Sequence, residues 1–113
     1  MPDFNYFNEL PVSITVCDKN GVILYMNAKS IATFAKDGGA GLVGRHLQDC
    51  HSPASIEKLN ILLSEQKSNT YTIEKNGVHK MIHQTPWFEQ GEYSGIIEFS
   101  FEIPVDVPHF VRS

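Results

Sequence analysis

The sequence predicts one α+β domain in which helices cross one face of an antiparallel sheet. Three observations indicate this fold class. Apolar residues recur at every second position near the start of the chain and over its last third, which is typical of strands. The middle of the chain has a helical spacing instead. Finally, 113 residues are enough for one core that buries roughly two-thirds of the unfolded surface.

The chain is expected to open with a short helix that flanks the sheet. Phe4, Phe7 and Leu10 are three residues apart, so they fall along one side of a helix, and Asp3 is a suitable N-cap. The period then changes to two over residues 12–17, where Val and Ile alternate with Ser, Thr and Cys. This alternation predicts a strand with one buried face.

A turn over residues 18–21 is expected to lead into a second strand, because its Asn-Gly pair supplies the positive φ values of tight hairpins. Residues 22–27 are apolar at nearly every position, so this strand should be covered on both faces. Short helices are expected over residues 28–34 and 43–49. The glycine-rich segment 37–41 is expected to be a loop between them.

The longest helix is expected to start near Pro53, because proline is favoured in a first turn and Ser52 or Ser55 can cap it. An apolar stripe at helical spacing supports this prediction. The stripe consists of Ile56, Leu59, Leu62 and Leu63.

The rest of the sheet is expected to be three strands over residues 70–75, 78–88 and 93–103, joined by turns that contain glycine. The last strand has the clearest inside–outside alternation in the sequence. Its apolar members are Ile97, Phe99, Phe101 and Ile103, and they alternate with Glu98, Ser100 and Glu102.

Charge and composition exclude several classes of protein. The formal net charge is −4 and the nine Lys and Arg residues are scattered, which argues against binding to a phosphate backbone. The two cysteines, without CxxC spacing, fit reduced thiols of a cytoplasmic protein. No run approaches the roughly 20 apolar residues of a membrane span. The sequence therefore predicts a cytoplasmic protein that binds neither nucleic acid nor membrane.

Three spaced motifs resemble those of one sensory family. Asp18, Gly21, Ile23, Asn27 and Ala28 resemble the pattern D-x-x-G-x-I-x-x-x-N-x-A, with the alanine one position earlier than in the pattern. Gly44-Arg45-His46-Leu47 matches a G-[KR]-x-[LV] turn, and a late Gly-Glu-Tyr-Ser-Gly hairpin leads to a strand that closes on Glu102-Ile103. In this order and at these separations, they resemble the PAS family over about residues 8–103. The Cys-His-Ser-Pro segment 50–53 is most similar to PAS domains found beside hemerythrin-like modules.

The resemblance implies a PAS-like five-stranded antiparallel sheet in the order 2-1-5-4-3, with short helices on one face. It implies an N-terminal flanking helix at residues 1–11, a PAS domain at 12–103 and a tail at 104–113. It also implies a sensory, non-catalytic domain that binds a small ligand, mediates contacts between proteins, or does both. No local nucleophile signature indicates an enzyme. The alternative is a haem- or other cofactor-dependent gas or redox sensor.

Candidate ligand residues come mainly from the strand over residues 78–88, where His79, Met81, His83, Thr85 and Trp87 share one face. The period cannot say whether this face looks into the cavity. If it looks inward, His83 and Trp87 offer a polar handle and a stacking surface; if outward, they form a partner-binding patch. The third interpretation is an ordinary half-exposed sheet face. Our candidate ligand-binding residues are His51, Met81, His83, Trp87 and Phe99.

Cofactors and metals have no specific motif. Haem would need an axial histidine from His51 or His83, and His51 beside Ser52-Pro53 fits a role in bracing a loop better. The flavin-reactive cysteine motif of light-sensing relatives is absent. His79 and His83 are about 13 Å apart along a strand, too far to chelate one metal. The partner expected is a second copy, through the apolar residues Phe4, Phe7 and Leu10 together with the sheet, and a further signalling protein is a possible partner.

Overall fold

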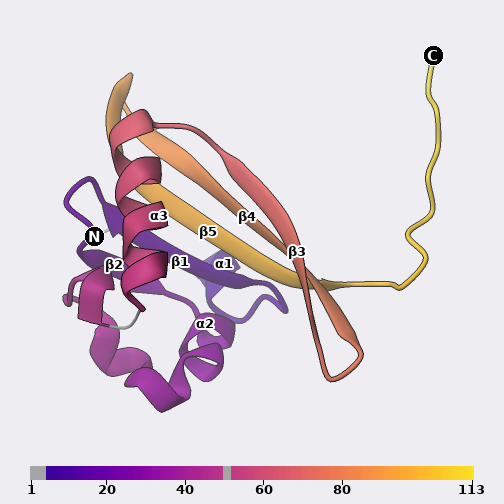
Figure 1. The fold of residues 1–113 in the computed structure, drawn as a ribbon, viewed down its shortest axis with the longest axis horizontal. Coiled ribbons are helices and arrows are strands. Elements are labelled where there is room, and N and C mark those ends of the chain that lie inside the picture. The colour runs from indigo at the N-terminus through magenta and orange to yellow at the C-terminus, as the bar shows by residue number, and fades with distance from the viewer. Residues whose placement is uncertain (1–4, 50–51) are drawn as a thin grey trace.

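A computed structural model describes residues 5–49 and 52–113 of the chain. One antiparallel sheet runs through the domain in the strand order β2-β1-β5-β4-β3 (Figure 1). This order and the α+β class are the ones that the sequence predicts. The strands are β1 Ser13–Asp18, β2 Ile23–Met26, β3 Asn69–Lys75, β4 Val78–Glu89 and β5 Glu92–Ile103.

Most of the helical structure covers one face of the sheet, as predicted (Figure 1). The segments on this face are α2 Ala28–Thr33, η1 Ala35–Asp37, η2 Gly39–Leu42, η3 Leu47–Asp49 and α3 Pro53–Glu65. The hydroxyl of Ser52 caps α3 by accepting from the backbone N–H of Ser55. The expected loop over residues 37–41 lies partly within two 3₁₀ turns, because Gly38 and Gly39 adopt positive φ values of 128° and 53° that let the chain reverse between them.

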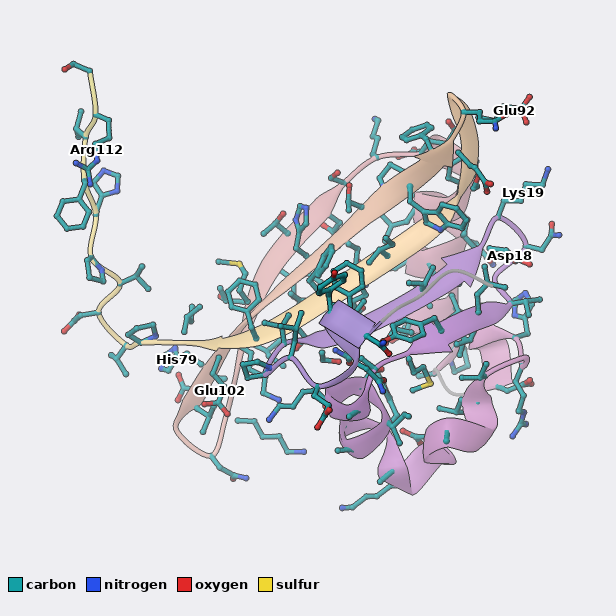
Figure 2. The ribbon with its side chains drawn as sticks, turned by 180° about the vertical axis from the view of Figure 1, so that it is seen from behind. Asp18, Lys19, His79, Glu92, Glu102 and Arg112 are labelled. Atoms are coloured by element: carbon teal, nitrogen blue, oxygen red, sulfur yellow. The ribbon has the colours of Figure 1, made fainter. Side chains whose placement is uncertain are left out.

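The short opening helix, α1 Asn5–Asn8, lies on the other face of the sheet (Figure 2). It is a single turn and ends before Leu10, whereas the sequence predicts a helix that includes this residue. Asp3 and Phe4, the expected cap and the first residue of the apolar stripe, lie outside the described residues.

Asn27 connects α1 to the rest of the domain. The residue is fully buried and its amide makes four hydrogen bonds. The side-chain oxygen accepts from the N–H groups of Ile14, at 3.0 Å, and Ser30, at 3.1 Å. Its nitrogen donates to the carbonyl groups of Phe7, at 2.8 Å, and Val12, at 2.7 Å. One side chain therefore joins α1 and the start of β1 to the N-terminus of α2.

Two of the motifs that resemble those of the PAS family, the stretch that contains Ile23 and the turn that contains Gly44 and Arg45, contact each other at the β2 edge of the sheet. The Ile23 N–H donates to the Arg45 carbonyl at 2.9 Å, and the Gly44 N–H donates back to the Ile23 carbonyl at 2.7 Å. Gly21, with φ 85°, packs so closely on His46 that a Cβ there would lie 2.9 Å from the imidazole Nε2. The β2 edge is thus covered, whereas every residue of β3 at the opposite edge is exposed.

The core lies between the sheet and the helices. Its buried members are Cys17, Ile23, Met26, Leu42, Leu47 and Ile96. Half-buried side chains of α2 and α3 pack against this cluster, but α3 itself has no fully buried residue. The helix therefore rests on the core along one stripe and leaves space beside it. No helix in the described ranges is both long enough and apolar enough to cross a bilayer.

The two faces of β5 are arranged differently from the alternation in the sequence. Thr15 pairs with Glu98 and Cys17 pairs with Ile96, and all four line the helix-covered side. The opposite parity places Ile97, Phe99 and Phe101 on the face away from the main helical layer. The interpretation of β5 as apolar-inside and acidic-outside was therefore wrong for Glu98, because the strand register decides which parity meets the helices.

Candidate functional site

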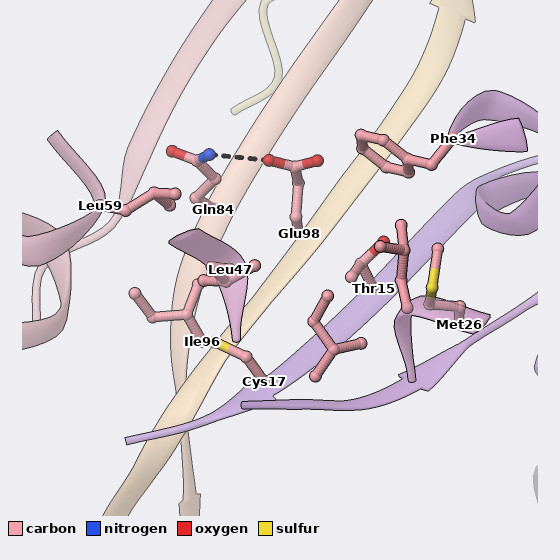
Figure 3. A pocket seen from close by; sticks show the side chains of 11 residues that line it. Thr15, Cys17, Met26, Phe34, Leu47, Leu59, Gln84, Ile96 and Glu98 are labelled. Atoms are coloured by element: carbon pink, nitrogen blue, oxygen red, sulfur yellow. Dashed lines mark hydrogen bonds between the residues drawn. The ribbon is translucent and has the colours of Figure 1, made fainter. Parts of the chain in front are cut away.

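A small interior pocket lies between the helices and the sheet (Figure 3). Its volume is about 30 Å³, enough for about one or two water molecules. Most of its wall is apolar and comes from the core, including Met26, Phe34 and Leu47. Glu98 and Gln84 are the strongly polar members of this wall.

A larger groove adjoins the interior pocket, between α3 and the strands β3, β4 and β5. Its volume is about 490 Å³, within the range of roughly 300–1,000 Å³ of small-molecule sites. Leu59 and Leu62 of α3 form one wall, and Tyr71 of β3 belongs to the other. Leu59 also lines the interior pocket, as do Gln84 and Glu98. The two cavities therefore meet at these three residues.

A chain of side-chain hydrogen bonds crosses the floor where the cavities meet. Asn69 donates its amide N–H to the side-chain carbonyl of Gln84 at 3.1 Å, and the Gln84 amide donates to Glu98 Oε2 at 2.7 Å. Gln84 is 7% exposed, so its orientation is fixed by these two bonds. In Figure 3 the second carboxylate oxygen of Glu98 points away from Gln84, toward the side of Phe34.

Glu98 gives this part of the molecule a negative field. Burial, and after it the nearby Glu98 carboxylate, raises the pKa of the Tyr71 hydroxyl in the groove. Burial raises the pKa of the Cys17 thiol beside the interior pocket, and Glu98 contributes the smallest part of that increase. Across the described part of the chain, the salt bridges join other carboxylates, namely Asp49, Glu65 and Glu74.

Four of the candidate ligand residues lie on the sheet face away from both cavities. His83 pairs with Phe99 and Met81 pairs with Phe101, on the parity opposite to Gln84 and Glu98. Trp87 shares that parity. The sequence left open whether the histidine face looks into the cavity or outward. In the structure it looks outward. Ligand binding by these residues stays a prediction, and such a ligand would lie on the open face.

The polar groups on this open face have partners within the sheet. The His83 Nδ1 lies 2.7 Å from the Thr70 hydroxyl, and His79 forms a 3.3 Å ion pair with Glu74 when it is protonated. The Trp87 indole N–H donates to the Cys17 carbonyl at 3.0 Å. Strand β5 lies between β4, which contains Trp87, and β1, which contains Cys17. At Gly95, β5 has no side chain, so the indole can cross the strand there.

The candidate dimer residues extend the same open face. Phe7 is 45% exposed and Leu10 is 38% exposed, and both belong to the segment at α1. Phe4, the third of them, and His51, the remaining ligand candidate, lie outside the described residues. The structure thus places on one face the described members of both predicted groups, the candidate ligand residues and the candidate dimer residues.

Sequence reasoning missed the residues of the groove floor. Gln84 and Glu98 look like solvent-facing members of alternating strands, and only their pairing across the β4–β5 hairpin brings them together. One signal was available, because Glu98 interrupts the otherwise apolar run from Ile96 to Phe99. An acidic residue in the centre of a central strand indicates either a solvent-facing position or a functional one.

Haem and metal do not fit the described part of this site. The residues that line the groove and the interior pocket include no histidine, cysteine pair or tyrosine placed as an axial ligand, apart from Tyr71 at the open rim. Among residues 5–49 and 52–113, no three His, Cys, Asp or Glu side chains are grouped as metal ligands. The site is suited instead to an organic molecule that is held by an apolar wall and one acidic group.

Solved structures from several bacteria have the same fold. A C-terminal domain from Streptococcus mutans superposes with a TM-score of 0.70 at 20% identity, over 87% of this chain and 80% of that chain. The PAS domain of BvgS from Bordetella pertussis gives 0.66 at 22% identity, over 88% and 82%. A Vibrio cholerae receptor described as a dual PAS-haem oxygen sensor gives 0.59 at 17% identity, over 82% and 95%. At these identities, the likeness shows the fold alone.

The sequence itself is matched by one family model. A search among curated proteins gives no match. The model described as the PAS fold matches residues 7–104, which is most of the chain and includes every strand of the sheet. PAS domains are generally sensory modules without catalytic activity. By this match, and in agreement with the strand order and the paired motifs at β2, the chain belongs to the PAS family.

Proposed function

We propose that this PAS domain is a ligand-responsive sensory module without catalytic activity. A small organic molecule binds in the groove beside α3, and the occupied domain changes how the open face of the sheet contacts a second copy. The single observation that carries the proposal is the groove itself, about 490 Å³ in volume, with an oriented polar pair on its floor.

The shape of the helical layer supports ligand binding. Leu59 and Leu62 lie on the stripe of α3 that faces inward, yet the helix has no fully buried residue. An apolar wall that is only half covered gains free energy when a ligand removes it from water. The polar pair Gln84–Glu98 fixes the orientation of the ligand, as a small number of polar groups does in most small-molecule sites.

The open face supports self-association. Ile97, Phe99 and Phe101 form an apolar row along β5, and Met81 lies beside Phe101 on β4. All four are only half-buried in the described structure. Contiguous apolar surface of this kind is typical of a protein contact. The exposed side chains of Phe7 and Leu10 widen the same surface, so a second copy is the proposed partner.

One residue pair provides a physical route between the two faces. The Cys17 side chain lines the interior pocket, and its carbonyl accepts the hydrogen bond of Trp87 from the open face. The pairing of β1 with β2 shifts register between Val16 and Cys17, and that of β4 with β5 shifts between Trp87 and Phe88. At such a shift the ladder of hydrogen bonds between the two strands is locally disrupted. A ligand that moves β1 at Cys17 would therefore move the indole.

Sedimentation equilibrium of two variants tests the self-association. Phe101→Glu puts a charge into the open face and should weaken the dimer at least tenfold, because a buried unpaired charge is strongly unfavourable. Tyr71→Glu is the matched control, since Tyr71 is a comparably large, exposed aromatic residue that lines the groove instead. A wild-type chain that stays monomeric at every concentration would remove self-association from the proposal.

Nuclear magnetic resonance screening of a fragment library tests the ligand site. Bound fragments should shift the side-chain amide signals of Gln84 and Asn69, and Leu59→Arg should abolish these shifts by filling the groove. Trp87 is the only tryptophan, so its fluorescence reports whether occupancy reaches the open face. A library that leaves both amide signals in place would contradict ligand binding. The haem alternative gains no support, since neither cavity is lined by histidine in the described part of the chain.

A further inference from the structure

The floor of the groove is polarised in one direction. Each amide in the chain of hydrogen bonds donates toward Glu98: Asn69 donates to Gln84, and Gln84 donates to Oε2 of Glu98. The Gln84 carbonyl and one Gln84 N–H are thus already used within the chain. What the floor offers to a ligand is chiefly the carboxylate of Glu98, which only accepts hydrogen bonds when ionised. A ligand group that contacts this carboxylate must therefore donate.

The charge of Glu98 has no cationic partner among the described residues. In the described structure, Arg45, Lys67 and His79 form salt bridges with other carboxylates. Lys58 also lines the groove, but it lies on the exposed surface of α3, where water screens its charge. The negative field of Glu98 is felt in both cavities, since the carboxylate contributes to the raised pKa of Tyr71 and of Cys17. A cation at Glu98 would neutralise this field.

The two cavities differ in size, so they suit different parts of one ligand, a small head group and an apolar body. The interior pocket, at about 30 Å³, has room for a head group of the size of a water molecule or an ammonium. The free oxygen of Glu98 points toward Phe34 in Figure 3, and aromatic rings attract cations. The groove, at about 490 Å³, accepts an apolar body between Leu59, Leu62 and Tyr71.

We propose that the groove beside α3 binds a small organic cation, a protonated amine on a compact apolar body, with the ammonium at Glu98. The inference rests on the ligand site of the proposed function and names the chemical class of its ligand. Glu98 supplies the charge, Gln84 is a positioning residue that holds the carboxylate, and Leu59 with Leu62 supplies the apolar contact.

Three probes of one shape and different charge test this class: benzylamine, benzyl alcohol and benzoate. Each is titrated into isotopically labelled wild-type protein, and the side-chain amide signals of Gln84 and Asn69 give the dissociation constant. Benzylamine should bind at least tenfold more tightly than benzyl alcohol, because a hydrogen bond between charged groups is roughly twice as strong as a neutral one. Benzoate should bind weakest.

Variants assign the effect to Glu98. Glu98→Gln keeps the size of the side chain and an oxygen that accepts from Gln84, so the fold is retained while the charge is lost. It should weaken benzylamine about tenfold and leave benzyl alcohol within about twofold. Glu98→Asp keeps the charge and should restore part of the affinity for the amine. Lys58→Gln is the control on the same groove and should leave the amine as tight or slightly tighter.

The outcomes separate this inference from the function on which it rests. If benzyl alcohol binds as tightly as benzylamine, or if Glu98→Gln leaves the amine unchanged, the amine class is wrong and the groove remains a ligand site. If benzoate binds best and Lys58→Gln weakens it, the ligand is an anion and the inference is likewise wrong. If none of the three probes shifts the groove signals at saturating concentration, both the amine class and the ligand site are contradicted.

Discussion

The helix-covered face and the open face of the sheet each combine polar and apolar side chains, but they combine them differently. The covered face has Thr15, Gln84 and Glu98 among its inward side chains, whereas the open face has an apolar row along β5. In most antiparallel sheets with one covered face, the covered side is the apolar one. This chain departs from that arrangement at two places, a few polar side chains within the apolar layer under the helices and a half-buried apolar row on the open face, and our two proposals rest on these departures.

The buried polar groups are tolerated because they are hydrogen-bonded to one another. Thr15 and Ser30 share a hydrogen bond of 2.5 Å, and Gln84 is bonded on both sides. A satisfied polar pair costs little, whereas an unpaired one would cost roughly 1–3 kcal/mol. The apolar row on the open face is not covered by the main helical layer, so this is the surface on which the proposed second copy would pack.

The largest effect on stability is expected at Gly95 of β5, the position that the Trp87 indole crosses to reach the Cys17 carbonyl. A Cβ at Gly95 would lie 2.0 Å from the Cys17 carbonyl oxygen, and its φ of 152° is unfavourable for other residues. Gly95→Ala should lower the free energy of unfolding by about 4 kcal/mol or more. It should also break the hydrogen bond between Trp87 and Cys17, and chemical denaturation followed by Trp87 fluorescence measures both.

A second glycine provides the control for this substitution. A Cβ at Gly41 would meet nothing within 4 Å. Gly41→Ala should therefore change the stability by no more than about 0.5 kcal/mol. If Gly95→Ala proved as mild as Gly41→Ala, β1 and β5 could separate at low cost, and the route from the interior pocket to the open face would lose its rigid part.

The next largest effect is expected at Asn27, which holds α1 on the open face and α2 on the covered face. Asn27→Ala leaves four backbone groups without their side-chain partner, in two buried and two partly buried hydrogen bonds, so the free energy of unfolding should fall by about 3 kcal/mol. Hydrogen exchange should also show that residues 5–8 lose protection. Asn60→Ala, at an exposed position in α3, is the control and should be neutral. Protection that persists at α1 would mean that contacts other than Asn27 hold the helix.

Much of the fold could be predicted because its signals are local. The cap at Ser52, the apolar stripe of α3 and the turns between the last three strands lie within a few residues of each other, and all of these elements formed close to the predicted bounds. The strand order came from the resemblance and not from the pattern. The end of α1 was missed because a single turn is held by tertiary contact with Asn27 rather than by its own spacing.

The site could not be predicted because its signals are not local. Alternation divides a strand into two faces but does not say which one the helices cover, and that choice places Glu98 inside and Phe99 outside. The preference for His83 and Trp87 as ligand residues came from their chemistry, which suits a ligand or a partner equally well. Gln84 became visible only through its pairing with Glu98.

The smallest effect tests the covered face alone, through the pH dependence of stability. Burial, opposed in part by a hydrogen bond with the Ile96 backbone, raises the pKa of the Cys17 thiol. The neutral thiol is thus favoured in the folded protein, and its contribution is fully present below the pKa of the unfolded thiol, about 8.5. The contribution is lost as the pH rises from there through the folded value, because the unfolded chain ionises first.

Wild type and Cys17→Ala should therefore converge in alkaline solution. The variant loses the packing of the sulfur at every pH, so it begins less stable, but its free energy of unfolding should fall less steeply above about pH 8.5. Tyr25 and Tyr71, whose pKa values burial also raises, contribute equally to both proteins and cancel in the difference. The pKa of Tyr93 is raised by burial and, to a smaller extent, by Cys17, so that smaller part belongs to the difference. Parallel curves would mean that water reaches the Cys17 thiol in the folded state, and the interior pocket would then be open to solvent rather than closed over a ligand head group.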